Sequence, residues 1–165
     1  LIPWEGSDPT RQLLLILSFS SLVFLFFNFS NRKGLKAFLG DGGSLCLGFI
    51  VAASLVEFSA SNMHYDPSVV LWLTAVPVLD FCTVIVRRKL LKRSMMVADR
   101  SHLHHFLMSF GLSHLQTTAL ISIVAVALVL FGLKVASNYP NISVWFFVAL
   151  YLIYLSIRIF AVRGK

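Results

Sequence analysis

Charge is scarce in this chain of 165 residues, where Asp, Glu, Lys and Arg together make up 13%, about half of the share in globular domains. Two cysteines are too few for a disulfide scaffold, and nine glycines without a period exclude a collagen-like chain. Hydrophobic residues, in contrast, make up 58%, and the mean hydropathy is +0.83. This excludes a disordered chain, and a soluble core of this size cannot bury so much apolar surface. We therefore expect lipid to surround most of the chain.

Five apolar segments each approach the length that a helix needs to cross about 30 Å of hydrocarbon at about 1.5 Å per residue. No internal repeat or linker separates them, so we predict a single transmembrane domain over residues 1–165. The predicted fold is an all-α, polytopic membrane helical bundle with about five transmembrane helices. The segments cover residues 12–29, 44–60, 69–86, 117–135 and 142–157.

Basic residues follow the first, third and fifth of these segments, whereas the other loops hold almost none. The positive-inside rule then predicts that the N-terminus lies outside and the C-terminus in the cytoplasm. The net charge of +7 serves to orient the helices and to contact anionic lipid or phosphate, and we expect no nucleic-acid partner. The basic residues concerned are Arg32, Lys33, Lys36, Arg87, Arg88, Lys89, Lys92, Arg93, Arg100, Arg158, Arg163 and Lys165.

The first candidate site is the glycine-rich stretch Phe38-Leu39-Gly40-Asp41-Gly42-Gly43-Ser44, which leads into the second segment. Its glycines let backbone N–H groups turn toward an anion, and a helix N-terminus adds partial positive charge. Asp41 could hold Mg²⁺ against a phosphate, because Mg²⁺ usually takes one or two carboxylates and shares phosphate oxygens. The alternative is a simple turn in which Ser44 caps the helix, and the motif by itself favours that alternative.

The second candidate site is Asp99-Arg100-Ser101-His102-Leu103-His104-His105, which holds three of the five histidines. Asp99 as the N-cap and Gly111 as the C′ residue bracket a predicted short helix. The histidines fan across one side of that helix. The other side is apolar and consists of Leu103, Phe106, Leu107 and Phe110, at i, i+3, i+4 and i+7.

Such an amphipathic helix can lie on the cytoplasmic face of the membrane with its imidazoles turned to solvent. The histidines could bind substrate phosphates, move protons or hold a metal ion, or they could simply be solvated. Zinc is disfavoured, because the helical zinc signature pairs histidines at i and i+4, and no cysteine or second acidic ligand lies beside them.

Asp80, in the stretch Pro77-Val78-Leu79-Asp80, is an acid inside the third apolar segment. An acid within a membrane is costly and marks a candidate functional residue. We favour a structural role for Asp80, or a role in supporting the residues of a site, and expect Pro77 to loosen the helix. Glu57 is predicted to be an interfacial acid near the outer end of the second helix.

These three motifs, in this order and spacing, resemble those of the polyprenyl-phosphate N-acetylhexosamine-1-phosphate transferases. The resemblance is carried by Phe-Leu-Gly-Asp-Gly-Gly-Ser at 38–44, Pro-Val-Leu-Asp at 77–80 and Ala-Asp-Arg-Ser-His-Leu-His-His at 98–105. The His-x-His-His form is closer to the WecA-type branch, which joins GlcNAc-1-phosphate to undecaprenyl phosphate, than to the branch whose histidines run together.

The resemblance implies a bacterial inner-membrane enzyme whose cytoplasmic face transfers N-acetylhexosamine-1-phosphate, with GlcNAc the expected sugar, from a UDP-sugar to undecaprenyl phosphate. UMP would be released at the start of cell-envelope polysaccharide synthesis, such as that of O-antigen. The resemblance also implies Mg²⁺ or Mn²⁺ as cofactor, with Asp41 as metal ligand. The resemblance assigns catalytic roles to Asp41, His102, His104 and His105. It assigns substrate binding to Gly43, Ser44, Asp99 and Arg100.

Members of this family are about twice as long, and their Asp-Asp and Asn/Asp-rich motifs have no counterpart in this sequence. The chain therefore resembles the C-terminal half of such an enzyme, and by itself is expected to lack groups that catalysis needs. Gly42 stands where the family has Ala, and Ser94-Met95-Met96 stands where Ser-Pro-Phe is expected. A non-catalytic membrane scaffold stays open, and so does a metal or proton transporter, although most ionisable residues lie in loops. The sequence is also compatible with a homo-oligomer, in which a second copy of the chain is the partner.

Overall fold

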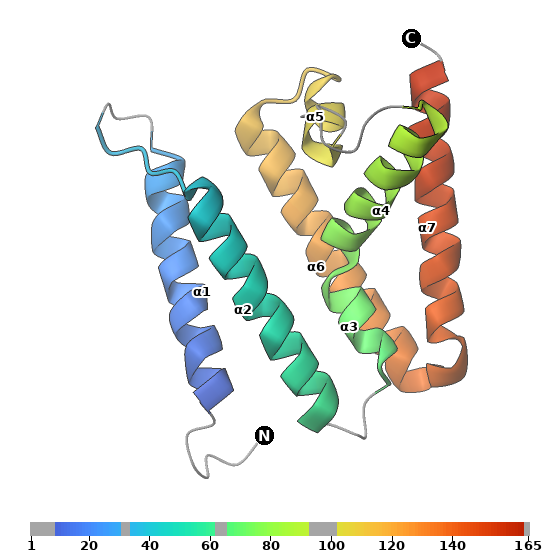
Figure 1. Cartoon of the computed structure of the whole chain (residues 1–165), viewed down its shortest axis with the longest axis horizontal. Helices are drawn as coiled ribbons and strands as arrows, with labels where there is room; N and C mark the ends of the chain where they lie inside the picture. Colours follow the sequence, from blue (N-terminus) through green and yellow to red (C-terminus); the bar gives the residue numbers. More distant parts are fainter. Residues whose placement is uncertain (1–8, 31–33, 62–65, 93–101, 164–165) are drawn as a thin grey trace. The chain divides into compact units, whose positions relative to one another are not determined.

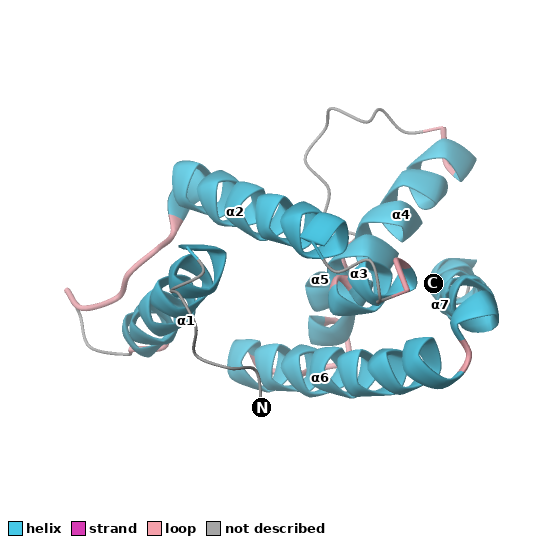
Figure 2. Ribbon diagram, turned by 90° about the horizontal axis from the view of Figure 1, so that it is seen from below, coloured by secondary structure: helices cyan, strands magenta, loops and turns pink. Residues whose placement is uncertain are grey.

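The structure is a computed structural model that describes residues 9–30, 34–61, 66–92 and 102–163. Every regular element in these residues is a helix, which confirms the all-α prediction (Figure 2). The chain falls into two compact units, residues 1–62 and 63–165, and the single domain over 1–165 stays a prediction. The helices are α1 (Pro9–Asn28), α2 (Gly40–Ser61), α3 (Ser68–Leu73), α4 (Ala75–Leu90), α5 (Leu103–Met108), α6 (His114–Asn138) and α7 (Pro140–Arg163).

The unit 1–62 consists of α1, α2 and the turn between them. At one end of the pair, the side chain of Asn28 donates a hydrogen bond to the carbonyl oxygen of Ala37 at 2.9 Å. Elsewhere, Thr10 at the start of α1 donates from Oγ1 to Glu57 Oε2 at 2.5 Å. Glu57, the acid predicted to be interfacial, is exposed and accepts this hydrogen bond from a hydroxyl group.

The third predicted segment is divided at Thr74, where α3 ends and α4 begins. Pro77 explains the break, because it has no N–H to donate to the carbonyl of Leu73 and its ring would clash with that carbonyl in a continuous helix. The hydroxyl of Thr74 donates to the carbonyl of Val70 at 2.8 Å, which stabilises the end of α3. The expectation that Pro77 loosens this helix is confirmed.

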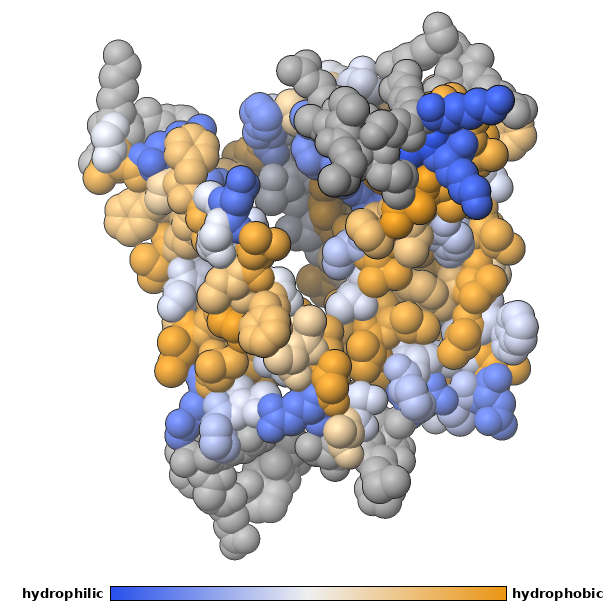
Figure 3. Space-filling view, in the orientation of Figure 1, coloured by the Kyte–Doolittle hydropathy of each residue, from blue (hydrophilic) through white to orange (hydrophobic). Residues whose placement is uncertain are grey.

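Four helices of the described part, α1, α2, α6 and α7, are long and apolar enough to cross a membrane. Together with the divided α3–α4 segment they occupy the five predicted apolar segments. Figure 3 shows apolar residues over the middle of α1 and α2, and hydrophilic residues gathered toward the ends of these helices. The prediction of a multi-pass helical membrane protein is confirmed, and the orientation of its termini stays a prediction.

The core of the unit 63–165 is built around Trp72, which is fully buried. Its ring lies edge-on to the rings of Phe131 and Phe147, with centroids 5.5 and 5.2 Å away. Its Nε1 donates to Ser143 Oγ at 3.0 Å, and Ser68 donates to the same oxygen at 2.7 Å. In this way α3 packs on α6 and α7 (Figure 1). Since lipid is as apolar as these side chains, close packing and satisfied polar groups hold the core together.

Helix α6 approaches Trp72 through Gly132, where a Cβ atom would lie 2.1 Å from Trp72 Cγ. We expect Gly132→Ala to lower the free energy of unfolding by about 1–3 kcal/mol, the usual cost of overpacking, even though Ala favours a helix by about 1 kcal/mol. Gly48→Ala in α2 is the matched control, because a Cβ there meets nothing within 4 Å. Thermal unfolding of the purified protein in detergent measures both variants, and equal melting temperatures would contradict the close approach.

Candidate active site

Asp41 lies in the first turn of α2, and its side chain is exposed. Gly40 before it has a φ of +67°, which glycine adopts without strain. The helix begins there, four residues before Ser44, so the alternative in which Ser44 caps the helix is wrong; its Oγ donates to the carbonyl of Asp41 at 2.9 Å. At Gly43 a Cβ would lie 2.9 Å from Leu39 Cγ, which favours glycine. The first N–H groups of α2 have no partner within the helix, an arrangement that suits an anion beside Asp41.

The three clustered histidines stand at the start of α5. His102 is the N-cap residue, with φ −62° and ψ 158°. The rings of His102 and His104 are stacked with centroids 6.0 Å apart, and those of His104 and His105 are 4.1 Å apart. The prediction that Asp99 caps this helix is wrong, because the helix begins directly after His102. Asp99 and Arg100 themselves lie outside the described residues.

The apolar side of α5 packs on α6, and its residues Leu103, Phe106 and Leu107 are half-buried. Phe110 lies past the end of the helix and is exposed. Gly111 has a φ of +89° and donates its N–H to the carbonyl of Met108 at 3.0 Å. The helix ends at Met108 with Ser109 as its C-cap, so Gly111 is the second residue after the C-cap and not the first, as predicted. The spacing therefore indicated the correct buried side of this helix, apart from Phe110.

Asp80 joins α4 to the start of α5. Its Oδ2 lies 2.9 Å from His102 Nδ1, and its Oδ1 accepts the backbone N–H of Leu103 at 2.8 Å. Tyr154, on α7, donates from its hydroxyl to the same Oδ1 at 3.4 Å. The side chain of His102 makes no capping hydrogen bond, so a carboxylate from another helix satisfies the first N–H of α5. This geometry agrees with the supporting role favoured for Asp80, which stays a prediction.

Arg158 is buried, although it is among the basic residues predicted to follow the fifth apolar segment. That prediction is wrong, because α7 continues to Arg163 and Arg158 is only 1% exposed. Its guanidinium carbon lies 4.3 Å from the centroid of the Phe106 ring and 5.9 Å from that of Tyr154. The spacing of Tyr151, Tyr154 and Arg158 at i, i+3 and i+7 is the signal that could have indicated a shared inward face.

The pKa of His104 is lower than the ordinary value for a histidine. Burial lowers its pKa from 6.5, the neighbouring His105 and His102 lower it further, and Asp80 opposes the shift. The neutral imidazole therefore dominates at neutral pH, so His104 offers one donor and one acceptor nitrogen rather than a fixed positive charge.

The structure brings some of the predicted site residues together. Asp80, His102, His104 and His105 meet within the unit 63–165, whereas Asp41, Gly43 and Ser44 belong to the unit 1–62. Within the described ranges, no group of three or more His, Cys, Asp or Glu side chains could hold a metal ion. Sequence reasoning missed Tyr154, which contacts Asp80, and the inward position of Arg158, whose guanidinium lies over the rings of Phe106 and Tyr154.

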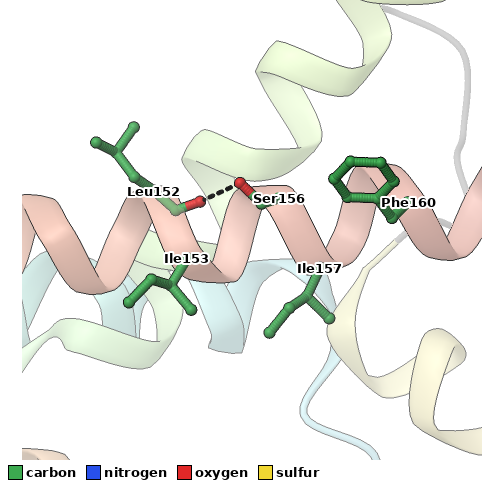
Figure 4. Close-up of a pocket in the computed structure, with 5 residues that line it drawn as sticks. All are labelled: Leu152, Ile153, Ser156, Ile157 and Phe160. Atoms are coloured by element: carbon green, nitrogen blue, oxygen red, sulfur yellow. Dashed lines mark hydrogen bonds between the residues drawn. The ribbon is translucent and has the colours of Figure 1, made fainter.

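The surface of α7 also carries an open hollow of about 580 Å³. Its one hydroxyl, on Ser156, donates back to the carbonyl of Leu152 at 2.8 Å and so is already occupied (Figure 4). This apolar surface suits hydrocarbon chains rather than a sugar nucleotide. The hollow is lined by Leu152, Ile153, Ser156, Ile157 and Phe160.

No family model and no solved structure matches the chain. Among curated proteins, it is 36% identical over 120 residues to the probable undecaprenyl-phosphate N-acetylglucosaminyl 1-phosphate transferase of Bacillus subtilis. This match covers 72% of the chain and 33% of the Bacillus protein. It is 32% identical to the undecaprenyl-phosphate alpha-N-acetylglucosaminyl 1-phosphate transferases of Yersinia pestis and Escherichia coli K12, over 72% of this chain and 32% of each relative. The chain is a homologue of the C-terminal part of these transferases.

The match to these transferases spans about a third of their length and lies in their C-terminal part. A continuous stretch that covers 72% of the chain must include its middle. Asp80 and the histidine cluster therefore lie within the region shared with the transferases. The predicted resemblance to these transferases is confirmed.

Proposed function

We propose that the chain forms part of an enzyme that transfers GlcNAc-1-phosphate from UDP-GlcNAc to undecaprenyl phosphate. In this reaction the bond between the two phosphates of the donor breaks, a new phosphoanhydride bond forms with the lipid phosphate, and UMP leaves. The observation that supports the proposal is the match to curated transferases named for this lipid phosphate and this sugar phosphate. The lipid-linked product would enter cell-envelope polysaccharide synthesis.

The basic end of α4 supports a cytoplasmic site in the bacterial inner membrane. Arg87, Arg88 and Lys89 form the last turn of α4. In the unit 63–165, α5 and the C-terminal end of α7 lie at the same end of the bundle (Figure 1). Positive residues favour the cytoplasmic side, where water-soluble UDP-sugars are found. The C-terminus would then also be cytoplasmic, and the N-terminus outside.

The candidate residues of each unit suit phosphoryl chemistry. Asp41 is an exposed carboxylate, and Mg²⁺ is commonly bound by one or two carboxylates together with phosphate oxygens, so the donor chemistry fits Mg²⁺ or Mn²⁺. The metal ion would offset negative charge on the phosphates. The histidine cluster, His102, His104 and His105, supplies nitrogens that can form hydrogen bonds with phosphate oxygens. His104 does so in its neutral form at neutral pH, because its pKa is lowered.

Membranes that contain the whole protein test this function directly. With UDP-GlcNAc, undecaprenyl phosphate and Mg²⁺, we expect release of UMP and formation of one lipid pyrophosphoryl sugar per UMP. Omission of the lipid phosphate should abolish both products, because the lipid is the acceptor. Replacement of UDP-GlcNAc by UDP-GalNAc reports which N-acetylhexosamine is used. Absence of UMP release from either donor, in membranes where the protein is present and folded, would reject the transferase and favour a scaffold.

A further inference from the structure

The contact between Asp80 and His102 fixes where the imidazole carries its proton. An ionised carboxylate has only acceptor positions, so the 2.9 Å contact between Oδ2 and Nδ1 places a proton on Nδ1. Nε2, on the far side of the ring, is then the nitrogen available to other groups. The side chain of His102 is 43% exposed, whereas that of Asp80 is 16% exposed, so the held edge of the ring is the inner one.

The same carboxylate also fixes where the ring stands. Its second oxygen accepts the N–H of Leu103, the first residue of α5, at 2.8 Å. Since one carboxylate holds both the ring of His102 and the next backbone amide, the residue has little freedom to turn. Tyr154 bonds to this carboxylate from α7, so that α4, α5 and α7 meet at one side chain.

We propose that Asp80 is a positioning residue for His102, which it holds in the Nδ1–H form so that Nε2 faces the phosphate groups of the substrates. Neutral Nε2 can accept a hydrogen bond from a protonated phosphate oxygen. When the imidazole gains a proton, the carboxylate behind it stabilises the charge. The kinetic test of this inference rests on the proposed transferase function, whereas the tautomer of His102 is measured independently of it.

Asp80→Asn separates the two tasks of the carboxylate. The amide oxygen of Asn still accepts the Leu103 N–H, but its NH₂ group now meets His102 Nδ1, which must accept and move its proton to Nε2. We expect ¹⁵N NMR of histidine-labelled protein, assigned with His102→Gln, to show the Nδ1–H form in the wild type and the Nε2–H form in the variant. The kcat/KM for transfer should fall by about 10²-fold, which is typical when a proton-handling group loses its correct form.

Asp66→Asn is the matched control. Asp66 Oδ1 likewise accepts a helix-starting N–H, that of Ser68 at 2.8 Å, and the substitution removes the same charge. A merely structural loss of a capping carboxylate would act on both variants alike. We expect Asp66→Asn to leave the tautomer of His102 and the kcat/KM unchanged.

Three outcomes decide the matter. A wild-type His102 protonated only on Nε2 would overturn the proposal. This measurement needs no variant, so it decides the matter even if Asp80→Asn folds poorly. An unchanged kcat/KM in a folded variant whose tautomer had reversed would overturn it as well. Absence of transfer by the wild-type protein rejects the proposed function instead, and the Nδ1–H tautomer then still tests the role of Asp80 by itself.

Discussion

Asp41→Asn is expected to lower sugar-phosphate transfer by the whole protein about 10³-fold, because a neutral amide binds Mg²⁺ far more weakly than a carboxylate does. The fold should tolerate the change, since Asp41 is exposed in the first turn of α2 and Asn is similar in size. Initial rates of UMP release, measured against Mg²⁺ concentration in membranes with equal amounts of protein, give the comparison. A raised Mg²⁺ requirement in the residual activity would identify the metal as the lost interaction.

Glu57→Gln provides the matched control for this substitution. Glu57 is an exposed acid on the same helix, and its Thr10 partner can donate equally well to an amide oxygen. We expect this variant to keep full activity, because removal of a negative charge from α2 is not in itself harmful. Full Mg²⁺-dependent transfer by Asp41→Asn would count decisively against a metal-ligand role for Asp41.

The helices were predictable from the sequence because a backbone in lipid must satisfy its own hydrogen bonds, so a long apolar run forms a helix. The ends of the helices were less predictable. The apolar window for α7 ended at residue 157, one position before a charged residue, whereas the helix continues to Arg163. The guanidinium of Arg158 lies over the rings of Phe106 and Tyr154, and a hydropathy window does not register such contacts between helices.

The candidate site was predictable as a set of residue types and not as an arrangement. Local spacing indicated a short helix with its histidines on one side. The side chain that caps this helix, Asp80, lies 22 residues before His102 on another helix, and no local pattern pairs the two. Local spacing predicts Asp99 as the N-cap instead, because Asp is a preferred capping residue. Contacts that cross between helices depend on packing, which spacing along one helix does not contain.

Arg158→Ala is expected to lower the free energy of unfolding by about 3 kcal/mol, because it removes a large buried side chain and its contact with an aromatic face. Its effect should be greatest at α5, whose Phe106 rests on the guanidinium. Hydrogen exchange at the amides of α5, with thermal unfolding in detergent, measures both effects. Lys89→Ala is the control, since Lys89 is an exposed basic residue in the last turn of α4 and its loss should change neither.

Arg158→Met decides which property of the arginine holds α5 in place. Met has a similar length and fills much of the same volume, but it has no charge to place over Phe106. A buried charge is costly to desolvate, and an apolar replacement of equal volume is often neutral or stabilising. We nevertheless expect Arg158→Met to increase exchange at α5, because a desolvated cation over an aromatic ring contributes about 2 kcal/mol. Wild-type protection of α5 in this variant would show that volume alone holds the helix, and the histidines on it would then owe their position to packing and to Asp80.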